Sequence, residues 1–271
     1  MIRATSAIAA IAIGLAACTT PAQVEPLPTP SVDPFEVRVR GLQRDVAAVV
    51  ALQVAAMPLL DPALTSIRAV DAVLPRLLDD ATLDDALSRL SEVVDAVAGI
   101  DLDPARPATR EVAAAVDAAR LSLATTLEVI THGGDRAYLD AEDAVLVAVR
   151  AHAEATDALA QVLELHLPTY VSALDLLTDF ASRRSRFRSA SEAADALAVE
   201  LEQVLGQIAL AQQDVGQYVA ARADSVRAVN TAQDAATAAW ESRAPGGSEP
   251  PGEQRPGDQL PGEDVSGQEG E

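Results

Sequence analysis

The chain contains no lysine, a single cysteine and very few aromatic residues. All 20 basic residues are arginine, so no lysine amine is available to form a Schiff base. Aromatic residues make up 3% of the chain, which argues against stacking platforms for sugars, nucleobases or proline-rich peptides. One cysteine cannot form an intramolecular disulfide or a multi-cysteine metal site.

Charge and apolar content limit the function classes further. Asp and Glu number 41 against 20 Arg, giving a net charge of −21. Such a surface repels phosphate backbones, so we expect no nucleic-acid partner. Hydrophobic residues make up 49% of the 271, and most are Ala, Val and Leu. This composition suits closely packed helices, and the length allows one large domain or two small ones.

The first 17 residues have the features of a signal peptide. Arg3 provides a short positive region, and the 14 residues from Ala4 to Ala17 are almost entirely apolar. A membrane span needs roughly 20 apolar residues, so this stretch is too short to be one and instead fits the hydrophobic region of an export signal. Residues 1–17 are therefore predicted to be removed.

The sequence Leu15-Ala16-Ala17-Cys18 resembles the lipobox of bacterial lipoproteins. The resemblance covers only the amino terminus. It implies cleavage before Cys18 and attachment there of a diacylglyceryl group carrying fatty acids such as palmitate. Two acyl chains anchor a protein durably, so the predicted location is the outer face of the cell membrane, with the lipid on Cys18 as the membrane contact. An ordinary signal peptide cleaved near Thr20-Pro21-Ala22 is the alternative.

Two segments of biased composition flank the body of the chain. Residues 18–35 contain five prolines, which favour an extended tether; residues 19–34 could reach about 50 Å from the membrane. Residues 244–271 consist largely of Pro, Gly, Gln and acidic residues, and three short repeats begin with Pro-Gly. With almost no apolar content, this acidic tail is predicted to be disordered.

Residues 36–243 are predicted to form an all-α domain, an elongated antiparallel helical bundle. Apolar residues recur there at intervals of three and four, with hardly any alternating runs. Asp61 and Thr82 are predicted N-caps, and Pro168 is predicted to begin a separate helix. The predicted helices cover about 36–57, 61–77, 82–99, 108–132, 136–167, 168–183 and 191–243.

The last of these helices is the longest. Leu201, Ile208, Val215, Val229 and Ala236 recur every seven residues, and Arg222 interrupts the repeat. We expect this helix to pack against 108–132 and 136–167. A homodimer formed through it as a coiled coil is the alternative.

Four arginines, Arg183, Arg184, Arg186 and Arg188, form the only concentration of positive charge. They could bind an acidic partner, an anionic polymer or a phospholipid head group. Alternatively, they pair with the chain's own carboxylates at a junction between helices. Replacing Arg184, Arg186 and Arg188 with Gln should separate partner binding from folding.

No local pattern predicts a metal, a cofactor or catalysis. Gly-x-Ser-x-Gly, His-Glu-x-x-His and glycine-rich phosphate loops are absent. The acids of 79–85 are explained by helix capping, since the glycine and alternating ligands of a calcium loop are missing. We therefore expect neither an enzyme nor a bound cofactor or metal.

Two functions follow from these patterns, with an envelope hydrolase as a weaker third. The first is a non-catalytic scaffold or accessory module that contacts an envelope protein. The second is a lipoprotein that binds a small ligand or metal inside the bundle. Its candidate residues are Glu128, His132, Tyr138, His152 and Tyr170.

Overall fold

The computed structural model describes residues 34–130 and 133–242. These residues form helices and turns without a strand, which confirms the predicted all-α class. The α-helices are α1 (Pro34–Ala56), α2 (Asp61–Leu77), α3 (Leu83–Ser88), α4 (Leu90–Ala98), α5 (Ala105–Leu127), α6 (Gly133–Arg183) and α7 (Ala190–Glu241). There are two 3₁₀ turns among the described residues. η1 (Met57–Leu60) joins α1 to α2, and η2 (Arg184–Arg186) follows α6.

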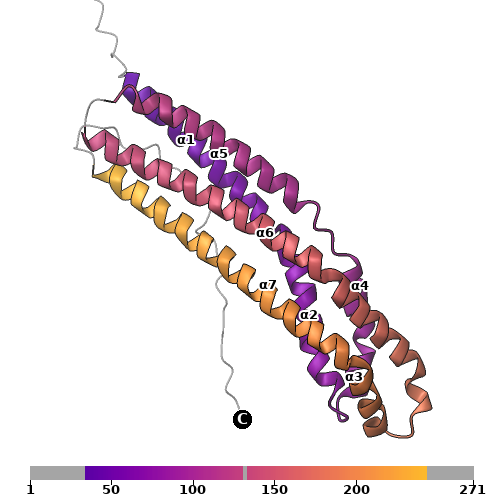
Figure 1. The fold of residues 1–271 in the computed structure, drawn as a ribbon. Coiled ribbons are helices and arrows are strands. Elements are labelled where there is room, and N and C mark those ends of the chain that lie inside the picture. The colour runs from indigo at the N-terminus through magenta and orange to yellow at the C-terminus, as the bar shows by residue number, and fades with distance from the viewer. Residues whose placement is uncertain (1–33, 131–132, 243–271) are drawn as a thin grey trace, which may run out of the picture.

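The helices form four rows that run up and down a long rod (Figure 1). The first row is α1, η1 and α2, and the second is α3, α4 and α5. The third and fourth rows are the unbroken helices α6 and α7, of 51 and 52 residues. At 1.5 Å per residue each unbroken helix is about 77 Å long. The predicted elongated antiparallel bundle with a long final helix is confirmed.

The seven-residue pattern of α7 identifies its buried face. Leu201, Ile208, Val215, Val229 and Ala236 are all buried, as expected for the apolar positions of a heptad repeat. α7 packs along α6, as predicted. The prediction that it packs chiefly against residues 108–132 as well is wrong: α5 lies mainly against α1 and α6.

The core consists of two groups of apolar side chains, one in each half of the rod. The first half combines α1 and α5 with the beginning of α6 and the end of α7. The second combines α2, α3 and α4 with the remaining parts of α6 and α7. Leu59 in η1 packs against both groups. The breaks in the first two rows thus fall where one half of the core gives way to the other.

The predicted helix break at Pro168 is wrong. α6 continues through this residue to Arg183. A proline inside a helix removes one backbone hydrogen bond, so tertiary contacts must hold the helix together there. His166 lies 3.0 Å from Asp214 of α7, and the hydroxyl of Tyr170 donates to Asp71 of α2 over 3.2 Å. These contacts fix α6 to its neighbours on both sides of Pro168.

Of the two predicted N-caps, Asp61 is wrong and Thr82 is confirmed in position only. Leu60 is the N-cap of α2, and Asp61 is its first helical residue. Thr82 is the N-cap residue of α3, as predicted, but its side chain does not cap the helix; its hydroxyl donates to the carbonyl of Arg76 over 2.7 Å. That bond holds the chain between α2 and α3 in a tight turn. The predicted helix over 82–99 is split at Arg89 into α3 and α4.

Several predictions concern residues outside the described ranges. These are the signal peptide, Cys18, nearly all of the tether, His132 and the tail after 243. Within the described ranges, Phe35–Leu77 is long and apolar enough in composition to cross a membrane. Core helices pass the same criterion, and Val39, Leu42 and Val49 of this segment are buried inside the bundle.

Candidate functional site

A band of buried and partly buried polar side chains crosses the middle of the rod. Each row contributes a polar residue at a core position: the residues seven places before and after it in the sequence are apolar and buried. We call this band the polar layer. It comprises Gln53 of α1, Thr109 of α5, His152 and Thr156 of α6, and Arg222 and Ser225 of α7.

The repeat of α6 shows how unusual this layer is. Val145, His152 and Leu159 follow one another at intervals of seven, and so do Val149, Thr156 and Leu163. All six are at most 2% exposed. The two polar residues therefore occupy core positions, as Arg222 does between Val215 and Val229.

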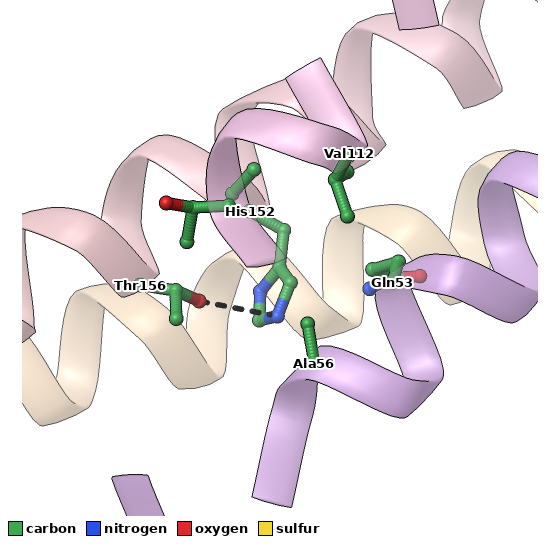
Figure 2. Close-up of a pocket in the computed structure, with 7 residues that line it drawn as sticks. Gln53, Ala56, Val112, His152 and Thr156 are labelled. Atoms are coloured by element: carbon green, nitrogen blue, oxygen red, sulfur yellow. Dashed lines mark hydrogen bonds between the residues drawn. The ribbon is translucent and has the colours of Figure 1, made fainter. Parts of the chain in front are cut away.

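Hydrogen bonds assign the proton of His152. The hydroxyl of Ser225 donates to the backbone carbonyl of Arg222 over 2.7 Å. Ser225 Oγ lies 2.8 Å from His152 Nδ1, so it accepts the Nδ1–H. Nε2 is then the acceptor nitrogen of the neutral ring, and the hydroxyl of Thr156 faces it at 3.4 Å. Figure 2 shows this contact and the ring facing Gln53 and Ala56 of α1.

The surroundings of His152 favour its neutral form. Burial lowers its pKa from the usual 6.5, and the positive charge of Arg222 lowers it further. A bond to the backbone of Arg222 opposes these effects and is the smallest of the three. The polar layer therefore holds one charged residue, Arg222, beside an imidazole kept neutral.

Arg222 has few partners for a buried cation. Its side chain is 12% exposed, and one amino group donates to the carbonyl of Met57 in η1. The other lies 3.6 Å from Asp61, whose carboxylate is 65% exposed. Within the described part of the chain, its buried Nε has no hydrogen-bond partner. Buried charges normally have a full set of partners, so this guanidinium is under-satisfied.

The interior of the polar layer has little free space. A cavity of about 10 Å³ lies among Gln53, Thr109, His152 and Thr156, closed by Ala56, Val112 and Ala153. This is about the smallest space that holds one water molecule. The cavity in the polar layer can therefore hold one water molecule, but it has no room for an organic ligand.

A larger groove opens on the outside of the same level, between the start of α2 and α7. Its volume is about 410 Å³, within the range of small-molecule sites. Arg222 lines it from one side, so the groove adjoins the polar layer. We call it the α2–α7 groove; its lining residues are Met57, Asp61, Leu64, Thr65, Arg68, Val219, Arg222, Ala223 and Val226.

The arginine cluster predicted as a partner site lies at the turn between α6 and α7. Arg183 forms ion pairs with Asp179 and Glu200 and lies over the ring of Phe180. These carboxylates raise its pKa further. Arg184 forms two hydrogen bonds with Asp84 of α3, at 2.8 and 3.2 Å. Both side chains have internal partners, as the structural alternative expected.

Arg186 and Arg188 differ from the other two arginines of the cluster. Both are exposed, and neither side chain forms an ion pair with another described residue. The backbone N–H of Arg188 donates to Glu192 over 2.9 Å, which helps to begin α7. Among the described residues, these two are thus the arginines of the cluster without an internal ion pair.

Three of the five residues predicted to form a ligand site inside the bundle do not converge. Tyr138, His152 and Tyr170 all lie on α6, about 21 and 27 Å apart along the helix. Tyr138 donates to the buried carboxyl of Glu142, whose pKa is raised by burial. Burial and the charge of Asp71 raise the pKa of Tyr170.

Among the described residues, neither Glu128 nor the acidic segment 79–85 belongs to a group that could hold a metal ion. Glu128 is the C-cap of α5, and His132, which was expected to accompany it, lies outside the described ranges. Asp84 is bonded to Arg184, and Asp85 pairs with Arg89. Among the described residues, no group of three or more His, Cys, Asp or Glu is placed to hold a metal ion.

No protein-family model, curated protein or solved structure matches the chain. Function therefore has to be inferred from the chain's own residues. Sequence reasoning noticed Arg222 only as an interruption of the α7 repeat. That interruption was the available signal for the polar layer.

Proposed function

We propose that the protein is a non-catalytic helical scaffold, anchored to the outer face of the cell membrane through lipid on Cys18, that acts by contacting an envelope protein. The observation that carries this proposal is the filled interior. Both halves of the bundle are packed with apolar side chains, and the cavity at the polar layer is about 10 Å³. Such a rod offers its outer surfaces to other molecules and keeps its shape over about 77 Å.

One outer strip of α7 suits contact with a partner. Its residues are exposed, uncharged and within about 60° of one another around the helix. Val199 is 74% exposed and Leu210 63%. In a chain with a net charge of −21, a strip without charge lowers the desolvation cost of a contact. The strip consists of Val199, Gln203, Gly206, Leu210, Gln217 and Ala221.

Site-specific cross-linking tests the scaffold. A photo-reactive amino acid is placed at Leu210 in intact cells, and at Leu165 of α6 as the matched control, because that leucine is 70% exposed on another face. We expect one discrete adduct with an envelope protein from position 210 and none from 165. An adduct between two copies would identify the homodimer as the partner. The absence of any adduct would contradict the proposal.

The anchor is tested separately from the scaffold. Mass spectrometry of the mature amino terminus should find a diacylglyceryl group on Cys18. A Cys18→Ser variant should leave the membrane fraction while retaining the helical circular-dichroism spectrum. An unmodified Cys18 in protein isolated from the membrane fraction would contradict the proposed lipid anchor.

A further inference from the structure

The α2–α7 groove combines positive charge with an apolar wall. Arg68 and Arg222 both line it, whereas Asp61 is its one lining carboxylate. Leu64, Val219 and other apolar side chains make up most of the remaining wall. In a chain with twice as many acids as arginines, a wall with more arginines than acids is locally electropositive.

Neither arginine is fully neutralised by the described chain. Arg68 is exposed and forms no ion pair with another described residue. Arg222 has only the long 3.6 Å approach to Asp61, and its Nε has no partner among the described residues. Because Asp61 is largely exposed, water screens that attraction. An anion in the groove would supply the missing counter-charge to both guanidiniums.

The lining also restricts the kind of anion. A small inorganic anion would leave the apolar wall wet, while a neutral apolar molecule would leave the guanidiniums unpaired. The strongly negative overall charge disfavours polyanions, which would meet acidic surface beyond the groove. A volume of about 410 Å³ accommodates a small organic molecule.

We propose that the α2–α7 groove binds a small amphipathic organic anion, with one carboxylate or phosphate head between Arg68 and Arg222 and an apolar body along Leu64 and Val219. This activity goes beyond the proposed scaffold and does not depend on it.

Calorimetric titration of the folded protein with decanoate, below its micelle concentration, tests the site. We expect one decanoate bound per chain, with decanol and acetate each at least about tenfold weaker, since each lacks half of the interaction. Decyl phosphate tests whether a phosphate head is accepted in place of carboxylate. Equal binding of decanol, or no saturable binding of decanoate, would overturn the proposal.

Two variants and their controls place the site. Arg68→Gln should weaken decanoate about tenfold, whereas Arg76→Gln, the same change on α2 outside the groove, should not. Ala223→Phe should fill the groove and abolish binding, whereas Ala220→Phe on the exposed side of α7 should leave it intact. All four positions are exposed, so folding is preserved. Loss of binding in either control would overturn the assignment to this groove.

A second readout comes from the polar layer. An anion that neutralises Arg222 removes one of the effects that lower the pKa of His152. The NMR titration of the His152 ring should therefore move to higher pH when decanoate is bound, and should not move in Ala223→Phe. An unchanged titration at saturating decanoate would show that the anion does not reach Arg222.

Discussion

His152 Nδ1 and Ser225 Oγ lie 2.8 Å apart, and the bond between them joins the two unbroken helices at the middle of the rod. The Ser225 hydroxyl in turn donates a hydrogen bond to the backbone carbonyl of Arg222. A polar residue at a core position of a helical bundle allows fewer alternative registers than an apolar one, since a shifted helix would leave it unpaired. The layer thus restricts how α6 and α7 can slide past each other.

The first prediction concerns pH. The pKa of His152 is lowered on folding from its usual 6.5, so the unfolded chain binds the proton more tightly. Its contribution to the free energy of unfolding is present above pH 6.5 and falls as the pH drops below it. His152→Gln should reduce this fall and cost about 1–3 kcal/mol at pH 7.5. Urea denaturation of both proteins between pH 5 and 8 measures the difference; parallel curves would contradict it.

The second prediction concerns Glu142, whose effect on stability has the opposite pH dependence. Burial raises the pKa of Glu142 above its usual 4.5, so the folded state holds the proton more tightly. Its contribution is fully favourable below pH 4.5 and is lost as the pH rises through the higher folded pKa. Glu142→Gln should therefore raise the melting temperature at pH 7 and change it little at pH 4. A lower melting temperature at pH 7 would refute this.

The third prediction is that both halves of the rod unfold together. Leu146→Ala and Leu177→Ala each remove a fully buried side chain, one in each half of the core, and should cost about 2–5 kcal/mol. Since α6 and α7 run through both halves, each variant should show one transition by circular dichroism. Leu165→Ala, at an exposed position of α6, is the control and should stay within about 0.5 kcal/mol of the wild type. Two separate transitions would show independent halves.

The fourth prediction tests the start of α7. The Ser189 hydroxyl accepts the backbone N–H of Glu192 over 3.1 Å, and the Glu192 carboxylate accepts the N–H of Arg188. Ser189→Ala should therefore lower the free energy of unfolding by about 0.5–2 kcal/mol. Ser191→Ala, two residues along at an exposed helical position, should have almost no effect. Equal losses in the two variants would exclude a specific cap.

The fifth prediction divides the arginine cluster. Arg184→Gln should lower the melting temperature, because it breaks the two bonds to Asp84. Arg186→Gln with Arg188→Gln should leave melting unchanged, because neither side chain has an ion-pair partner in the described chain. If the cluster binds the envelope partner, this double variant should also reduce the adduct formed from position 210. An undiminished adduct would mean that the cluster has no such role.

The spacing of apolar residues correctly predicted which side chains are buried where a helix packs against the same neighbours along its length. It identified the buried residues of α7, such as Leu201 and Val229, because apolar positions at heptad spacing face the partner helices. It failed at Pro168, where the outcome depends on contacts of His166 and Tyr170 with residues distant in sequence. Proline alone carries no information about such contacts.

The candidate sites depended even more on long-range pairing. Arg68 and Val219 are 151 residues apart in sequence, and only the folded bundle places them in one groove. Gln53 and Thr109 are ordinary polar residues when their helices are considered singly. They become informative once His152 and Arg222 are found at the same level of the rod.

Both ends of the described chain emerge at the same end of the rod, since four rows return the chain to its starting side (Figure 1). A force applied between the two ends therefore acts across the rod. It would separate α1 and α7 from their neighbours one turn at a time, at low force. The same force between the start of α1 and the α6–α7 turn would act along the rod and meet many contacts at once. The rod's resistance to tension therefore depends on which two of its points are held.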